Sequence, residues 1–146
     1  MEMKRVFNVF CFYKGKIYKS RKISPILMKI KTSKAIFEVE LNNSETAKAI
    51  ESVLPITGTV NKWGDEIYVY VKEDIELEED ATDVVDNGAV CYWPDGPALC
   101  IFYGPTPMSK ANECRAASLV NIIGKIKGSL EKLREIQPKD KITFEK

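Results

Sequence analysis

The order of hydrophobic and polar positions predicts a chain built mainly from short β-strands. Between Phe37 and Leu41, apolar residues alternate with glutamates, which is the period expected of a strand with one buried face. Comparable short apolar runs recur along the chain and are separated by turn-forming residues. The strands predicted in this way are Ile26–Lys31, Ala35–Leu41, Glu66–Val71, Ala89–Trp93, Ala98–Tyr103, Leu119–Ile126 and Lys141–Glu145.

Two short helices are expected among these strands. Ser44 can cap a helix whose apolar stripe runs from Ala47 to Leu54, and Pro55 then ends it. A second short helix is expected over residues 129–136. Many short strands with hairpin turns and only two helices favour an all-β protein, a closed or nearly closed antiparallel β-barrel.

The strongest local signal is the Pro94–Pro97 segment, Pro-Asp-Gly-Pro, which lies between two apolar runs and predicts a hairpin. With a four-residue loop, Trp93 pairs with Ala98 and Cys91 lies directly opposite Cys100. Two cysteines placed in this way could form a disulfide if the geometry is met. Two reduced, buried thiols are the ordinary state of such residues in a reducing compartment, and this is the expected state.

Residues 1–25 differ from the rest of the chain in charge and pattern. Residues 1–26 carry seven basic groups and one acidic group, whereas the whole chain carries 22 basic and 21 acidic residues. Aromatic residues interleaved with Lys and Arg can bind single-stranded nucleic acid. The competing interpretations, which we favour, are a poorly ordered extension or a translation start at Met28. The predicted domains are therefore an extension, 1–25, and a barrel, 26–146.

Composition narrows the possible functions. A chain of 146 residues, 45% of them hydrophobic, is long enough for one domain with its own core. No apolar run is long enough to cross a bilayer and no signal peptide is recognisable, so a cytoplasmic location is expected. The chain has no histidine, which removes Ser-His and Cys-His catalysis and every His-ligated metal site. We expect no cofactor and no metal.

Four segments, taken together, resemble a family of small uncharacterised bacterial and archaeal proteins with a cyclophilin-like fold. The resemblance implies a barrel of about eight antiparallel strands with helices covering its ends, and it implies no demonstrated activity. Residues 1–25 lie outside it. The segments are Asn61–Tyr68, Gly88–Pro94, Ala98–Pro107 and Val120–Gly124.

The first hypothesis for the function is binding of a peptide or small ligand in a cleft built from aromatic side chains, the Gly104–Ser109 corner and Arg115. The alternative is a weak peptidyl-prolyl isomerase in which Arg115 donates to the prolyl nitrogen as the amide twists. The histidine and the Phe-Arg strand of the cyclophilin pocket have no counterpart here, and Arg115 could equally hold a loop through a salt bridge. The candidate ligand-binding residues are Asn61, Trp63, Asp65, Glu66, Trp93, Phe102, Gly104, Pro105, Thr106, Met108, Ser109 and Asn121.

Several of these residues also have structural interpretations. Asp65 and Glu66 would point to opposite faces of a strand, so they are poor candidates for a paired acid and base. Asn121 lies in an apolar strand and needs hydrogen-bond partners, which the Gly104–Ser109 loop could supply. The acidic run Glu73–Asp80 lacks the spacing of a calcium loop and is interpreted as a half-exposed edge strand. The natural ligand and the oligomeric state are not set by the sequence.

Overall fold

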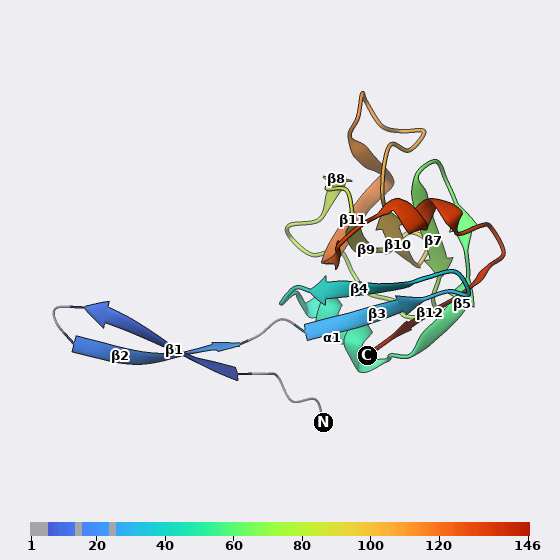
Figure 1. Ribbon diagram of the computed structural model, residues 1–146. Helices are drawn as coiled ribbons and strands as arrows, with labels where there is room; N and C mark the ends of the chain where they lie inside the picture. The colour runs from blue at the N-terminus through green and yellow to red at the C-terminus, as the bar shows by residue number, and fades with distance from the viewer. Residues whose placement is uncertain (1–5, 14–15, 24–25) are drawn as a thin grey trace.

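The computed structural model describes residues 6–13, 16–23 and 26–146, the first two ranges by their backbone only. Within residues 26–146 the structure has one α-helix, α1 (Glu45–Ser52), and a 3₁₀ helix, η1 (Glu131–Glu135). Strands make up most of the rest (Figure 1). They are β3 (Ile26–Lys31), β4 (Ile36–Leu41), β5 (Ile56–Thr59), β6 (Asn61–Lys62), β7 (Glu66–Tyr70), β8 (Thr82–Val85), β9 (Ala89–Trp93), β10 (Ala98–Phe102), β11 (Cys114–Lys127) and β12 (Lys141–Glu145).

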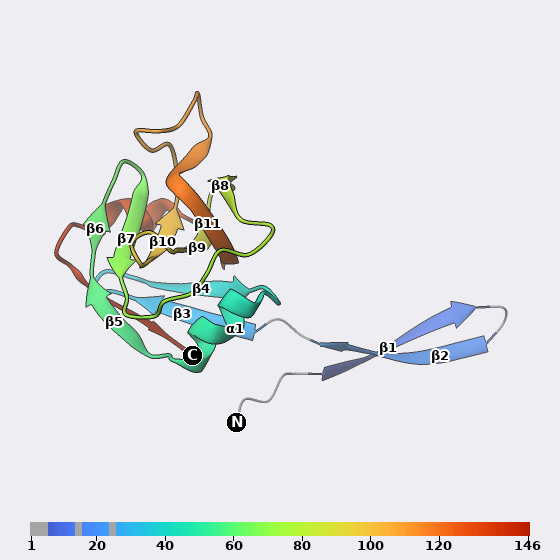
Figure 2. The same cartoon turned by 180° about the vertical axis from the view of Figure 1, so that it is seen from behind.

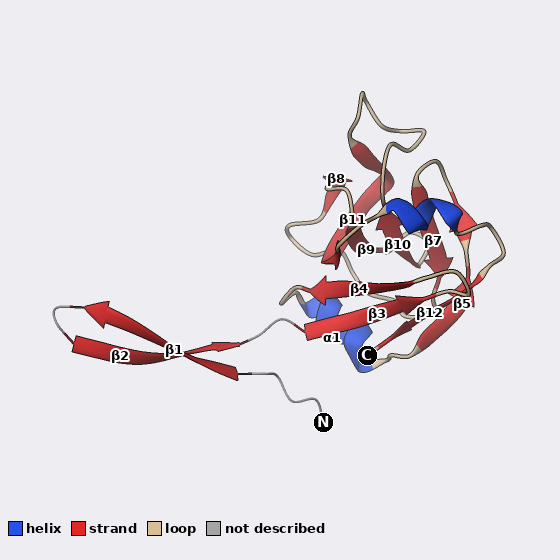
Figure 3. Cartoon of the chain, viewed as in Figure 1, coloured by secondary structure: helices blue, strands red, loops and turns tan. Residues whose placement is uncertain are grey.

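These strands form one antiparallel sheet of ten strands, shown in red in Figure 3. Nine of them lie in the order β5-β12-β3-β4-β11-β9-β10-β7-β6, and β8 pairs with β11. The expectation of a closed or nearly closed barrel of about eight strands is therefore wrong in strand number and in closure. The two ends of the sheet, β5 and β6, are joined through Val60 and are not paired with each other. The all-β class and the antiparallel pairing are confirmed.

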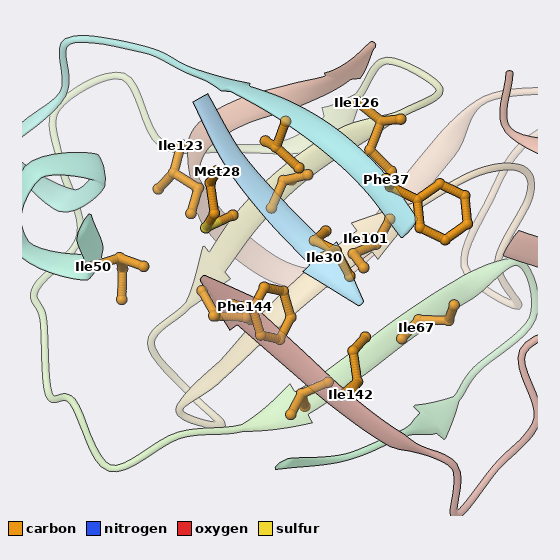
Figure 4. Close-up of a cluster of buried hydrophobic side chains, with 14 of the residues drawn as sticks. Met28, Ile30, Phe37, Ile50, Ile67, Ile101, Ile123, Ile126, Ile142 and Phe144 are labelled. Carbon is orange, nitrogen blue, oxygen red and sulfur yellow. The ribbon is translucent and has the colours of Figure 1, made fainter. Parts of the chain in front are cut away.

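The main hydrophobic core lies inside the curve of this sheet. Side chains from β3, β4, β7, β10, β11 and β12 converge there, and α1 adds Ile50 (Figure 4). The alternation of apolar residues and glutamates from Phe37 to Leu41 explains which side chains of β4 face the core, because every second residue of this strand is buried. The largest fully buried apolar side chains in this core include Met28, Ile30, Ile67, Leu99, Ile101, Ile123 and Phe144.

A second, smaller core lies on the outer face of β9 and β10. All five residues of β10 are buried, so this strand is covered on both faces. The cover on the outer face comes from β11, whose 14 residues pair with β4 and β9 along one part and with β8 along another. Cys91, Cys100, Phe102 and Val120 belong to this second core. The candidate site is built on this face.

The predicted hairpin is confirmed in its register. Trp93 pairs with Ala98, and Cys91 lies opposite Cys100. Both cysteines are buried and free, so the disulfide considered for them does not form in this structure. Strands β3, β9 and β12 have the predicted bounds, whereas β11 begins at Cys114 rather than at Leu119.

Three short strands, β5, β6 and β8, were not predicted, because segments of two to four residues carry little periodic signal. The acidic run Glu73–Asp80 is not the edge strand that its alternation suggested. The Tyr92 hydroxyl donates to the carbonyl of Glu73 and accepts from the amide of Ile75, at 2.6 and 2.9 Å. The segment is thus held by side chains of the sheet rather than by a strand ladder.

Residues Val6–Tyr13 (β1) and Lys16–Ile23 (β2) form a separate two-stranded antiparallel sheet, seen again from behind in Figure 2. Residues 1–5, 14–15 and 24–25 lie outside the described residues. The interpretations of 1–25 as a poorly ordered extension, a misplaced start or a nucleic-acid contact stay predictions. Among the described residues, no helix is long and apolar enough to cross a membrane.

Candidate functional site

A pocket of about 260 Å³ opens on the outer face of the sheet, beside the second core. Strands β7 and β10 form its floor, the first half of β11 forms one wall, and two tryptophans flank it. Most of its lining is apolar or aromatic. The lining residues are Trp63, Glu66, Tyr68, Tyr70, Trp93, Cys100, Ala116, Ala117 and Val120.

Strand alternation explains how β7 contributes to this pocket. Glu66, Tyr68 and Tyr70 are spaced by two residues and therefore share one face of the strand, while Ile67 and Val69 turn into the main core. The rings of Tyr68 and Tyr70 meet edge to face, with centroids 5.6 Å apart and an interplanar angle of 85°. This contact fixes two of the aromatic walls.

Small side chains create the open space between the aromatic ones. In the antiparallel pairing of β10 with β7, Cys100 lies opposite Tyr68 and Ala98 lies opposite Tyr70. Ala116 and Ala117 stand on β11 across from them. Because cysteine and alanine leave unfilled volume where larger residues would meet, the face keeps a hollow rather than a packed interface.

Trp93 is held in place by a chain of hydrogen bonds. Its indole Nε1 donates to Ser118 Oγ at 2.6 Å, and Ser118 Oγ donates in turn to Asp95 Oδ2 at 2.6 Å. Asp95 lies in the Pro94–Pro97 turn and Ser118 in β11, so the chain joins the hairpin to the strand that covers it. The orientation of this pocket wall is thereby set by both elements.

Glu66 is the carboxyl group of the pocket. It is 5% exposed and begins β7, where its backbone pairs with that of Trp63 across a turn. Burial raises the pKa of Glu66 to about 7, and a hydrogen bond with Cys100 opposes part of this effect. Near neutral pH the group can therefore hold or release a proton.

The surroundings of Glu66 contain thiols and phenols. Burial, with the nearby Glu66 as a further cause, raises the pKa of the Cys100 and Cys91 thiols and of the Tyr68 hydroxyl. These groups are neutral near pH 7. None of the nine residues that line the pocket is a lysine or an arginine. The site thus combines one ionisable acid with an aromatic enclosure, an arrangement suited to binding or proton exchange.

Comparison with known proteins adds the family. A model of the cyclophilin-like family matches residues 25–145, which is most of the chain and includes the whole ten-stranded sheet. The chain belongs to the cyclophilin-like family. This cyclophilin-like protein is similar to a hypothetical protein of Archaeoglobus fulgidus whose solution structure is known. The two are 41% identical with a TM-score of 0.72, and the match covers 83% of this chain and 94% of the other. No curated protein matches.

Three of the predicted ligand-binding residues of the cyclophilin-like protein meet in the pocket: Trp63, Glu66 and Trp93. Phe102 does not join them, since it is fully buried in the second core. Asn61 hydrogen-bonds the carbonyls of Thr59 and Tyr68 beside the β6–β7 turn and is not part of the lining. Asp65 does not line the pocket; it lies in the turn before β7, where its carboxylate is 3.2 Å from the guanidinium of Arg134.

The Gly104–Ser109 loop is a structural corner that does not line this pocket. The amide of Asp65 donates to the carbonyl of Pro105, and the amide of Tyr103 donates to the carbonyl of Asp65, both at 2.9 Å. A Cβ on Gly104 would clash with the Asp65 side chain, so any larger residue there would have to displace that carboxylate. Ser109 Oγ accepts from the amides of Thr106 and Arg115, and Thr106 hydrogen-bonds the carbonyl of Arg115. Met108 is exposed.

Arg115 is held by two carboxylates. Its guanidinium lies 2.8 Å from Asp83 on β8 and 2.8 Å from Glu113. The hydrogen bond to Glu113 is the main reason why the pKa of Arg115 is raised, and it lowers the pKa of Glu113 in turn. Arg115 does not line the pocket. The geometry matches the structural interpretation of this residue, and its catalytic role stays a prediction.

Asn121 is fully satisfied by partners other than the Gly104–Ser109 loop, so the expected partner was wrong. Its Oδ1 accepts from the amide of Glu78 at 2.8 Å, and its Nδ2 donates to Thr46 Oγ1 and to the carbonyl of Glu76. Thr46 Oγ1 donates to the Glu78 carboxylate at 2.6 Å. Asn121 therefore ties α1 and the acidic segment to the sheet.

Sequence reasoning did not include six of the lining residues among the ligand-binding candidates. Tyr68 and Tyr70 had a usable signal, because they follow Glu66 at intervals of two in a predicted strand. The others had none, since the sequence does not reveal that β11 crosses the outer face of β10. They are Cys100, Ala116, Ala117 and Val120.

Proposed function

We propose that this cyclophilin-like protein binds a small organic ligand, or one side chain of a peptide, in the pocket between β7, β10 and β11. The observation that carries the proposal is the placement of the Glu66 carboxyl, 5% exposed, in a hollow flanked by four aromatic rings. Placing an ionisable group among apolar walls with no charged partner in the lining costs free energy. A ligand that pairs with this group would offset the cost, and this favours an occupant.

The volume of the pocket favours a small occupant. About 260 Å³ lies just below the usual range of ligand sites. Mostly apolar walls with one convergent polar group are typical of a binding site in which the polar group sets orientation. A long peptide would have to leave most of its length outside, so a compact molecule or a single anchoring side chain fits best.

The isomerase alternative gains less support. A prolyl donor has to be free to reach the substrate nitrogen, whereas Arg115 is engaged by Asp83 and Glu113. Removing it from two carboxylates would use binding energy that could otherwise stabilise the twisted amide. We therefore place ligand binding first and the isomerase second.

Titration of fragments, followed by NMR, tests ligand binding. Trp63 and Trp93 flank the pocket, so their indole N–H signals report its occupancy. We expect fragments of a small set to shift these signals at millimolar concentration. Ala117→Phe should abolish the shifts, because Ala117 is an exposed residue of the rim where a ring would fill the opening.

Leu119→Phe is the matched control, since Leu119 is exposed on the same strand and does not line the pocket. In this variant, the fragments should move the two indole signals as far as they do in the unmodified protein. If no fragment moves either indole signal, or if both variants respond alike, the pocket is not a binding site.

A further inference from the structure

The charge of the pocket narrows the class of its ligand. This inference rests on the proposed function and asks what the occupant carries. Glu66 is the one carboxyl among the lining residues, and they include no cationic side chain. An ionised carboxylate with no cation beside it in an apolar site is costly, so a ligand that supplies the positive charge gains more than a neutral one.

The aromatic walls favour the same sign of charge. The face of an indole or phenol ring attracts a cation through its quadrupole. Trp63, Tyr68, Tyr70 and Trp93 all line the pocket with Glu66. The indole of Trp93 is additionally oriented through Ser118 by the Asp95 carboxylate. An anion would meet Glu66 without a counter-charge.

We propose that the pocket binds an organic ammonium ion, with the ammonium donating to Glu66 and the apolar body lying among the aromatic rings. The ammonium must keep at least one N–H, because the Glu66 oxygens are acceptors when ionised. A single charged group and a compact body match the volume of about 260 Å³. The class includes small amines and the amino end of a lysine side chain.

Binding of such an ion is linked to the protonation of Glu66. Tyr68 on the same strand, Cys100 on β10 and Cys91 on β9 are the titratable groups that face this carboxyl, and all three are neutral near pH 7. Ala116 and Val120 face it from β11 without charge. The cation therefore competes with one proton. With a pKa of about 7, affinity at pH 5.5 should be about 30-fold weaker than at pH 8.

Three compounds of nearly equal shape test the charge class on the full chain. Benzylammonium, benzyl alcohol and benzoate are titrated at pH 8 and at pH 5.5, with the Trp63 and Trp93 indole signals as the readout. We expect benzylammonium to bind at least tenfold more tightly than the other two at pH 8. Glu66→Gln should remove this preference and its dependence on pH, while Glu131→Gln, at an exposed carboxyl on η1, should keep both.

The outcomes separate this inference from the proposed function. If benzyl alcohol or benzoate binds as tightly as benzylammonium, and Ala117→Phe blocks them all, the pocket binds ligands but the cation proposal is overturned. If Glu66→Gln still prefers benzylammonium at pH 8, the cation proposal is overturned as well. If none of the three compounds moves the indole signals, while other fragments do, only the cation proposal fails. If no fragment moves the indole signals, both the proposed function and the cation proposal are overturned.

Discussion

Replacing Glu66 by glutamine should change how the stability of the protein depends on pH. A free glutamate has a pKa of 4.5, whereas burial raises that of Glu66 to about 7 in the folded state. Between these two values the folded state binds a proton that the unfolded state has released. Stability therefore falls as pH rises from 4.5 to 7, by about 1.4 kcal/mol per pH unit. The total loss is about 3 kcal/mol, and it is complete above pH 7.

The composition of the chain makes the range from pH 4.5 to pH 7 well suited to this measurement. It has no histidine, so no side chain with an ordinary pKa between 5 and 7 is present. The lowered pKa values of Glu113 and Asp140 change stability only below this window, where those carboxylates gain protons and their stabilising contribution is lost.

Urea unfolding at pH 4.5 and pH 8, followed by tryptophan fluorescence, is the assay. Glu66→Gln should lack the fall of about 3 kcal/mol. The difference in midpoint between variant and unmodified protein should then change by about 1–3 M urea across the window. Glu131→Gln, at an exposed site, should follow the unmodified protein. Parallel pH profiles for Glu66→Gln and the unmodified protein would refute the assignment of a neutral buried carboxyl.

Three other predictions concern residues outside the pocket wall. Asn121→Ala should lower the free energy of unfolding by about 1–3 kcal/mol in urea, because it removes the hydrogen bonds of the buried amide to Thr46 Oγ1, to the Glu78 amide and to the Glu76 carbonyl. A loss below about 0.5 kcal/mol would contradict this. The rate of cis/trans exchange of X-Pro peptides, measured by NMR exchange spectroscopy, should be the same with Arg115→Ala as with the unmodified protein, because the Arg115 guanidinium is held by Asp83 and Glu113. If the unmodified protein accelerates the exchange and the variant does not, the isomerase hypothesis regains its support. In a background with Cys11→Ser and Cys114→Ser, Cys91 and Cys100 should react with a thiol reagent only upon unfolding, since both are buried and burial raises the pKa of each thiol. Rapid reaction of the folded protein would contradict this.

Local sequence rules predicted most strands and the central hairpin. Alternation determined that Phe37 and Leu41 face inward, because a strand turns successive side chains to opposite sides. The Pro-Asp-Gly-Pro turn set the register that places Cys91 opposite Cys100. Asp65 and Glu66 also diverge, but the turn before β7 separates them, because Asp65 lies outside the strand. These features depend on neighbours within a few residues, which the sequence displays directly.

The tertiary structure alone decided what lies on the outer face of the sheet. Phe102 is apolar and was expected in a cleft, but β11 crosses over it and buries it. The partners of Asn121 lie 43 to 75 residues away, in the acidic segment and in α1. The pocket depends on Ala116 and Ala117 meeting β7 and β10 across that crossing. Packing between distant segments sets these contacts, and no local pattern encodes which segments will meet.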